Sequence, residues 1–143
     1  MTSMAWAPDG SGRLFLTGKD GQIWIVKDGV LQPETAYQFF PRYQNGELVT
    51  TSECGLASIA FDPAFTENHY IYVFVTLYVP PTSDTIQQQI IRFTMQGDVA
   101  TERTTLIAGL PSTGGNHNGG ALAFGPDGLL YWAVGNNNHI GEG

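Results

Sequence analysis

The sequence predicts an all-β fold of the β-propeller class, and three observations support this prediction. Apolar residues alternate with a period of two in several short segments rich in β-branched and aromatic residues, which is typical of strands. Turn dipeptides separate these segments, and no stretch of the chain carries the apolar stripe of a helix. One phrase, made of two strand-like halves around a proline, recurs along the chain.

The alternation places each expected strand between recognisable turns. Strands are predicted at residues 13–16, 23–26, 57–61, 71–76, 90–94, 121–124 and 130–134. Tight turns are predicted where the second residue of a dipeptide tolerates positive φ, at Asp9-Gly10, Asp20-Gly21, Asp28-Gly29, Asn45-Gly46 and Asp127-Gly128. Residues 35–48 and 80–87 are expected to form longer loops, since Pro80-Pro81 cannot continue a central strand. Helix content is expected to be negligible.

The repeated phrase sets the expected number of structural units. It covers residues 4–18, 59–76 and 122–136, with a proline at positions 8, 63 and 126. This spacing leaves room for about four short strands per unit, which is the size of one propeller blade. About three blades of a partial β-propeller are therefore expected in residues 1–143. Since a closed ring needs roughly four to eight blades, we expect blades from another fragment or another copy to complete it.

Composition excludes several classes of partner. Six Lys and Arg against thirteen Asp and Glu give a net charge of −7, so neither nucleic acid nor an anionic membrane is an expected partner. A small molecule or another protein is expected instead. The single cysteine, Cys54, allows no internal disulfide and no cysteine-based zinc site, and a buried, inert thiol is expected. The three histidines lack the spacing of a zinc motif, so no metal site is predicted from these residues.

The loop "NHNGG" at residues 116–120 contains the strongest candidate for chemistry, His117. A histidine among Asn and Gly is either a solvated turn residue or a side chain aimed at a ligand. Imidazole titrates near neutral pH and can act there as a general base. Glycines that permit a tight loop and a close approach to a flat ligand lie on both sides: Gly114, Gly115, Gly119 and Gly120. Of the other histidines, His69 is expected at the surface, and His139 is a weaker candidate for the same site.

Three separated motifs resemble one known family. "CGLASIAFDPAF" at residues 54–65 is similar to the family's Gly-Leu-Leu-Gly-hydrophobic-Ala-Phe-His-Pro-Asp-Phe signature. "QIIRFTM" at residues 89–95 resembles its Ser-Arg-Phe strand. "NHNGGALAFGPDGLLYWAVGN" at residues 116–136 resembles its His-x-x-Gly-Arg-Leu segment with a Pro-Asp-Gly turn. Over nearly its whole length the sequence resembles the soluble quinoprotein glucose/sorbosone dehydrogenases, also called aldose sugar dehydrogenases.

The resemblance implies a six-bladed β-propeller, of which this chain supplies about the first half. It implies a pyrroloquinoline quinone (PQQ) cofactor that receives hydride from the anomeric carbon of an aldose sugar, and calcium (Ca2+) bound by later blades. His117 falls on the family's general base and Asn136 on the group that orients it. Asn116 and Asn118 fall near the cofactor, and Glu53 is either a further cofactor contact or an exposed acid before a strand. A periplasmic or extracellular location is implied as well, although no signal peptide precedes the first repeat.

The sequence departs from the family at three positions around His117. Asn116 replaces an Asp, Asn136 replaces the usual acid, and Ala121 replaces an Arg. An amide accepts a hydrogen bond but supplies no charge, so a histidine paired with one loses part of its help as a base. Two classes of function therefore stay open. One is a PQQ-dependent sugar dehydrogenase, and the other is a catalytically silent propeller that binds a protein or a carbohydrate.

Overall fold

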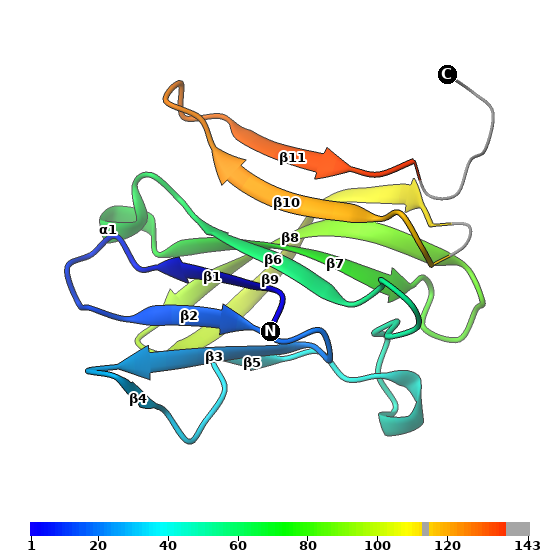
Figure 1. Ribbon diagram of the computed structural model, residues 1–143, viewed down its shortest axis with the longest axis horizontal. Coiled ribbons are helices and arrows are strands. Elements are labelled where there is room, and N and C mark those ends of the chain that lie inside the picture. The colour runs from blue at the N-terminus through cyan, green and yellow to red at the C-terminus, as the bar shows by residue number, and fades with distance from the viewer. Residues whose placement is uncertain (113–114, 137–143) are drawn as a thin grey trace.

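Antiparallel sheets dominate the computed structural model, which describes residues 1–112 and 115–136 (Figure 1). The first sheet contains β1 (Ser3–Trp6), β2 (Leu14–Thr17), β3 (Gln22–Lys27), β4 (Val30–Leu31) and β5 (Tyr37–Gln38). The second contains β6 (Leu56–Phe61), β7 (Tyr70–Tyr78), β8 (Ile86–Gln96) and β9 (Val99–Pro111), and the third contains β10 (Gly119–Phe124) and β11 (Leu130–Val134). Helical structure in the described residues is limited to α1 (Phe65–Asn68) and the 3-10 helix η1 (Arg42–Gln44). The predictions of an all-β fold and of negligible helix are confirmed.

The first strands of the three sheets lie side by side. β6 contacts both β1 and β10, and the Thr2 hydroxyl donates a 2.7 Å hydrogen bond to the Leu56 carbonyl. On the other side of β6, the Ser58 hydroxyl donates a hydrogen bond to the Gly120 carbonyl. Figure 1 shows the sheets stacked in chain order, with β6 between β1 and β10. Sheets that stack about their first strands have the arrangement of neighbouring propeller blades.

The repeated phrase forms the first hairpin of each sheet. β1 pairs with β2, β6 with β7, and β10 with β11, all in antiparallel register. Pro8, Pro63 and Pro126 lie outside the paired strands, where the missing N–H of proline removes no ladder hydrogen bond. The three repeats therefore correspond to three sheets. The number of blades in the complete ring stays a prediction.

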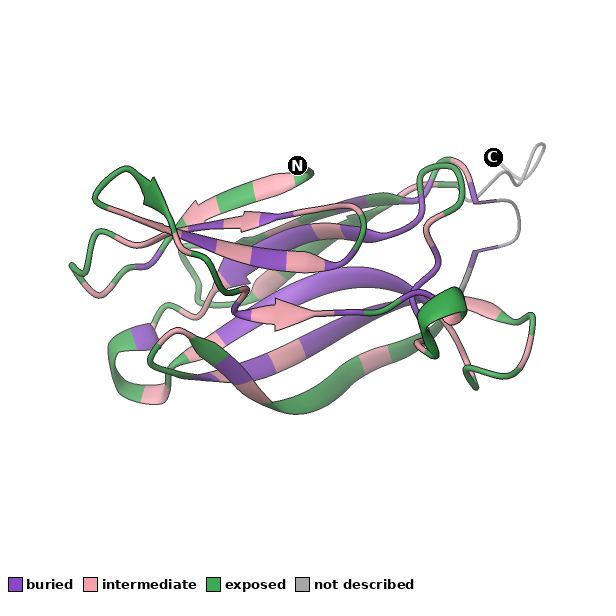
Figure 2. Ribbon diagram, turned by 90° about the horizontal axis from the view of Figure 1, so that it is seen from below, coloured by how far each residue is buried: buried purple, intermediate pink, exposed green. Residues whose placement is uncertain are grey.

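The main hydrophobic core lies between the first and second sheets, where Figure 2 shows the buried residues facing one another. Both sheets contribute fully buried side chains to it, among them Phe15, Ile23, Ile25, Ile71, Val73, Val75 and Phe93. The rings of Tyr37 and Phe93 pack with centroids 4.4 Å apart. The other face of the second sheet packs against the third, where Tyr72 meets Phe124 at 5.2 Å. β7 is therefore buried on both faces, which explains its nearly continuous apolar sequence.

Large apolar side chains remain exposed on the first and the last of the three sheets. Met4 and Trp6 of β1 are 62% and 64% exposed, and Tyr131 of β11 is 55% exposed. Large exposed apolar side chains that gather on one face of a sheet are typical of interaction surfaces. These faces support the expectation of further blades, which stays a prediction. In the part of the chain that the structure describes, no helix has the length and apolar character needed to cross a membrane.

All seven predicted strands are present, and the largest difference in bounds is the start of β8 at Ile86 rather than residue 90. β1 is not one of the predicted alternating segments but corresponds to the first strand-like half of the repeated phrase at residues 4–18, whereas β4, β5 and β9 were not predicted. β9 is the longest strand among the described residues, but most of its residues are exposed and a polar run at residues 101–105 interrupts its apolar residues, so no apolar alternation reveals it. Pairing with β8 stabilises it instead. The expected loop at residues 35–48 is partly wrong, because β5 pairs with β3 and η1 follows it.

The predicted turns are confirmed at four of the five dipeptides. Gly10, Gly21, Gly29 and Gly128 all have positive φ. The prediction is wrong at Asn45-Gly46, where Asn45 itself has a φ of 60° and ends the 3-10 helix. An asparagine tolerates the left-handed region better than most residues, so it can end a helix without a glycine.

Candidate active site

His117 lies on the loop that enters β10, and its side chain is exposed. Its φ is 58°, and that of Gly115 is 72°, so the loop makes a tight left-handed turn. Histidine is among the residues enriched in this region of φ/ψ space. The next residue, Asn118, is only 2% exposed. The loop therefore presents one imidazole to the surface and anchors itself through the residue that follows.

The carboxylate of Glu53 holds the backbone of this loop. Its Oε2 accepts a 2.6 Å hydrogen bond from the His117 N–H and a longer one of 3.4 Å from the Asn118 N–H. In return, the Glu53 N–H donates a 2.9 Å hydrogen bond to the Gly115 carbonyl. A carboxylate that accepts backbone N–H bonds forms charge-assisted hydrogen bonds, which are roughly twice as strong as neutral ones. Hydrogen bonds in both directions thus join the segment before β6 to the loop before β10.

The imidazole of His117 pairs with the side chain of Asn136. Its Nδ1 lies 2.9 Å from the Asn136 Oδ1. Because an amide oxygen can only accept a hydrogen bond, Nδ1 carries the proton in this arrangement. The lone pair of the neutral ring is then on Nε2. An amide rather than a carboxylate therefore orients this ring.

Close backbone approach brings His117 and Asn136 together. A Cβ on Gly135 would lie 1.8 Å from the His117 carbonyl oxygen, so only glycine fits at this position. The Gly135 N–H donates a 3.1 Å hydrogen bond to the Asn118 carbonyl. These contacts place the residue after β11 against the residue before β10. The two ends of the β10–β11 hairpin therefore make one site.

The buried side chain of Asn118 anchors the loop to the second sheet. Its Oδ1 accepts 2.7 Å hydrogen bonds from the Gln88 Nε2 and the Ser112 hydroxyl. Its Nδ2 donates to the Gly115 carbonyl at 3.0 Å and contacts the Cys54 Sγ at 3.4 Å. Asn118 was predicted to bind the cofactor, and this amide instead lies within a buried polar network. Such a network fixes one conformation of the loop, because a buried polar group that lost its hydrogen bond would cost free energy.

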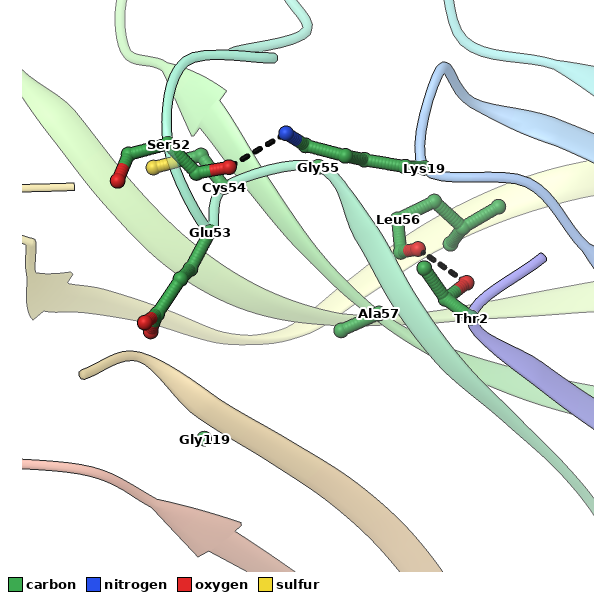
Figure 3. A pocket seen from close by; sticks show the side chains of 9 residues that line it. All are labelled: Thr2, Lys19, Ser52, Glu53, Cys54, Gly55, Leu56, Ala57 and Gly119. Atoms are coloured by element: carbon green, nitrogen blue, oxygen red, sulfur yellow. Dashed lines mark hydrogen bonds between the residues drawn. The ribbon is translucent and has the colours of Figure 1, made fainter. Parts of the chain in front are cut away.

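A pocket of about 330 Å³ lies beside this loop, where β6 and β10 begin (Figure 3). Lys19, Ser52 and Glu53 contribute its charged and polar lining. The Lys19 Nζ donates a hydrogen bond to the Ser52 carbonyl, and Glu53 points away from Lys19 (Figure 3). Since an ammonium group has three N–H donors, Lys19 retains donors for an anionic ligand.

Lys19 and Ser52 were not predicted as site residues. Lys19 follows the strand β2 of the first sheet, whereas Ser52 precedes the strand β6 of the second. In the sequence, each residue lies in a short loop next to a strand, Lys19 after Gly18 and Ser52 before Gly55. Many other residues share this position, so it does not identify a site. Only the stacking of the two sheets brings them together.

The structure places four of the five predicted site residues around one loop surface. Glu53 contacts the His117 backbone, Asn136 contacts its ring, and Asn116 accepts a hydrogen bond from the Ser52 hydroxyl. Asn118 points into the protein instead. His69 ends α1, and its exposed ring packs against Phe65 at 5.9 Å.

The remaining predictions concern residues near the loop. Cys54 is fully buried, as expected for an inert thiol. Gly119 and Gly120 have positive φ, and a Cβ on Gly120 would lie 2.7 Å from the Ala57 Cβ, so this glycine allows two strands to approach closely. Gly114 and His139 lie outside the described residues.

The sequence profile described as Glucose / Sorbosone dehydrogenase matches residues 2–142. The chain belongs to this family. The resemblance inferred from the sequence motifs is thereby confirmed, together with the β-propeller class.

Individual members and relatives of the family match the chain over part of their own length. Quinoprotein glucose dehydrogenase B of Acinetobacter calcoaceticus is 33% identical over 132 residues, which cover 84% of this chain and 27% of that protein. Hedgehog-interacting protein of Mus musculus is 34% identical over 140 residues, which cover 89% of this chain and 19% of that protein. The solved PQQ-bound form of aldose sugar dehydrogenase from Streptomyces coelicolor aligns with a TM-score of 0.75 and 25% identity, over 95% of this chain and 38% of that chain. The chain spans about a third or less of the length of its curated relatives.

The residues beside His117 fit one end of a planar, anionic quinone such as PQQ. The pocket contributes the Lys19 ammonium group, which suits a carboxylate. Its glycines, Gly55 and Gly119, lie against other backbone segments of the protein. Calcium is a different case. Within residues 1–112 and 115–136, no three His, Cys, Asp or Glu side chains form a group that could hold a metal ion. The calcium ligands that the family implies are therefore not assigned to these residues.

Proposed function

We propose that the full-length protein is a PQQ-dependent oxidoreductase that oxidises an aldose sugar at C1 to the lactone. One observation carries the proposal: an exposed imidazole whose Nδ1 pairs with the Asn136 Oδ1, which leaves the lone pair on Nε2, beside a pocket with one cation. A base of this kind can remove the proton of a hydroxyl group at neutral pH. The family match supports the choice of substrate and cofactor.

His117 performs the proton transfer in this proposal. Its Nε2 accepts the proton of the C1 hydroxyl while the C1–H bond breaks and the C1–O bond becomes a carbonyl. When bound, PQQ supplies the acceptor for the hydride. Asn136 keeps Nδ1 protonated, so that Nε2 faces the substrate, but it adds no charge to stabilise the imidazolium. Lys19 and Ser52 line the pocket in which an anionic quinone would bind, and Asn116 accepts a hydrogen bond from the Ser52 hydroxyl.

Further parts of the protein belong to the same proposal. Blades from another fragment or another copy complete the ring and supply the calcium ligands. The exposed apolar side chains of β1 and β11 support such a partner. A periplasmic or extracellular location is part of the same proposal and rests on the family resemblance.

A second candidate function is a catalytically silent propeller that binds a protein or a carbohydrate. Three observations favour it. The base is paired with an amide instead of an acid, and Ala121 replaces the arginine expected beside it. One relative at 34% identity is named for an interaction, Hedgehog-interacting protein.

Dye reduction by the purified full-length protein, with added PQQ and calcium, tests the two candidates across a panel of aldoses. PQQ binding is followed separately by its absorbance. We expect saturable binding of PQQ and oxidation of at least one aldose. A protein that binds no PQQ and oxidises no sugar would support the silent propeller.

A further inference from the structure

We propose that Glu53 is a positioning residue for His117, acting through the backbone rather than through a contact with the cofactor. This inference rests on the proposed function and deepens it, because it assigns the device that holds the base in place. Sequence comparison alone leaves Glu53 as either a cofactor contact or an exposed acid. The contacts of its carboxylate point to a third role.

The first step of the argument is the strained backbone of His117. Its φ of 58° lies in the left-handed region, which a residue with a Cβ adopts only at a cost. A conformation of this kind persists where surrounding contacts over-determine it. The ring direction depends directly on this φ, since the imidazole leaves the chain at the same Cα.

The second step is the hydrogen bond that satisfies the His117 N–H. The Glu53 Oε2 accepts it at 2.6 Å and lies 3.4 Å from the next N–H, that of Asn118. One carboxylate oxygen thereby spans two successive peptide units of the turn. Charge-assisted bonds of this kind are short and strong, so they select one geometry of the backbone.

The third step is the rigidity of Glu53 itself. Its own N–H donates to the Gly115 carbonyl at 2.9 Å, and the adjacent Cys54 N–H donates to the Thr51 carbonyl at 2.9 Å. Cys54 is fully buried. Glu53 therefore extends from a rigid turn, and the hydrogen bonds of its carboxylate hold the His117 loop in a fixed position relative to that turn. Asn136 then orients the ring that Glu53 has placed.

NMR spectroscopy of the isotope-labelled full-length protein tests this role without any assay of activity. We expect the His117 amide proton to resonate downfield and exchange slowly in the wild type. In Glu53→Ala it moves upfield and exchanges faster, whereas Glu53→Gln is intermediate because a neutral acceptor forms a bond roughly half as strong. Glu34→Ala, which removes another exposed acid, is the matched control. A His117 amide that is unchanged in both Glu53 variants overturns the proposal. If Glu53→Ala does not fold, Glu53→Gln against Glu34→Ala decides in the same way.

Kinetics of the full-length protein provides the second arm. We expect Glu53→Ala to lower kcat by about 10- to 100-fold with little change in KM, because a small displacement of a base costs that much in rate. Glu53→Gln should recover most of this loss, since its amide oxygen remains an acceptor. A loss in Glu53→Gln as large as in Glu53→Ala, or a loss confined to PQQ affinity, overturns the positioning role. A wild-type protein that oxidises no sugar refutes the proposed function alone, because the amide signal still decides the role of Glu53.

Discussion

The Nδ1 of His117 and the Oδ1 of Asn136 lie 2.9 Å apart, although one residue precedes β10 and the other follows β11. The register of the β10–β11 hairpin, which pairs Gly119 with Val134, brings them to the same end. A glycine at position 135 lets the two backbones touch. The orientation of the candidate base is therefore a property of one hairpin, not of its loop alone.

Replacing the base tests its role directly. In the full-length protein, His117→Ala should lower PQQ-dependent aldose oxidation by at least 10²-fold, because a positioned general base contributes on the order of 10²–10⁴ in rate. PQQ binding should survive. His69→Ala is the control, since His69 is exposed and lies at the α1 end of β6. Full activity of His117→Ala would show that another group takes the proton.

Restoring a charge beside the base should raise the rate. In Asn136→Asp a carboxylate replaces the amide that pairs with Nδ1, and its charge favours the imidazolium formed as the proton is transferred. Asn136→Ala removes the acceptor and should lower kcat. Steady-state kinetics with a saturating aldose ranks the three proteins. An Asp variant no faster than the Ala variant contradicts the proposed pairing.

The buried amide of Asn118 should contribute measurably to stability. Asn118→Ala leaves the Gln88 amide and the Ser112 hydroxyl without this partner, and a buried polar group that loses its hydrogen bond costs about 1–3 kcal/mol. Urea unfolding measures the free energy. Asn116→Ala on the same loop is the comparison, because its side chain is only half-buried. Equal destabilisation by the two substitutions would contradict the prediction that the buried network of Asn118 contributes more to stability than the half-buried Asn116.

Acid should weaken the ion-pair network that joins the first sheet to the β8–β9 turn. Burial alone would raise the pKa of Asp98, but hydrogen bonds from Lys27 and Arg13 outweigh it and lower that pKa. Burial likewise raises the pKa of Asp9, yet hydrogen bonds from Ser11 and Arg13 lower it from 3.8 to about 2.

The sign of the pH dependence follows from these lowered values. A carboxyl with a lower pKa in the folded state stabilises the fold above its unfolded pKa, and this contribution disappears as the pH falls through the folded pKa. We therefore expect unfolding free energies to fall between about pH 4 and pH 2, and less steeply in Asp98→Asn. Urea titrations at a series of pH values measure the slope. An Asp98→Asn slope as steep as that of the wild type contradicts the assignment.

The chain by itself should associate in solution. Its exposed apolar side chains, among them Trp6 and Tyr131, occupy the first and last sheets of the stack. Light scattering of the isolated chain should detect dimers or larger species, and Trp6→Lys should reduce them. A compact monomer with cooperative unfolding would contradict the expectation that further blades cover these faces.

Local pattern was enough to predict most strands, four of the five turns and the repeat that forms the first hairpin of each sheet. These features depend on neighbours in the sequence, because alternation and positive φ are local properties. β9 was not predicted because its polar run at residues 101–105 breaks any apolar period and most of its residues are exposed, and pairing with β8 stabilises it instead. β5 was not predicted for a related reason, because a strand of two residues is too short to show an alternating pattern.

The sequence by itself determined the fold class and the family and identified His117 as the candidate base, because period-two alternation, repeated turns and a motif loop can be recognised without coordinates. Only the tertiary structure decided how the site is built. It turned Asn118 inward to a buried network, placed the Glu53 carboxylate on the His117 N–H, and brought Lys19 from another sheet to the same pocket. The physical reason is that hydrogen bonds between segments 30 to 64 residues apart depend on how the sheets stack, and no local pattern encodes that stacking.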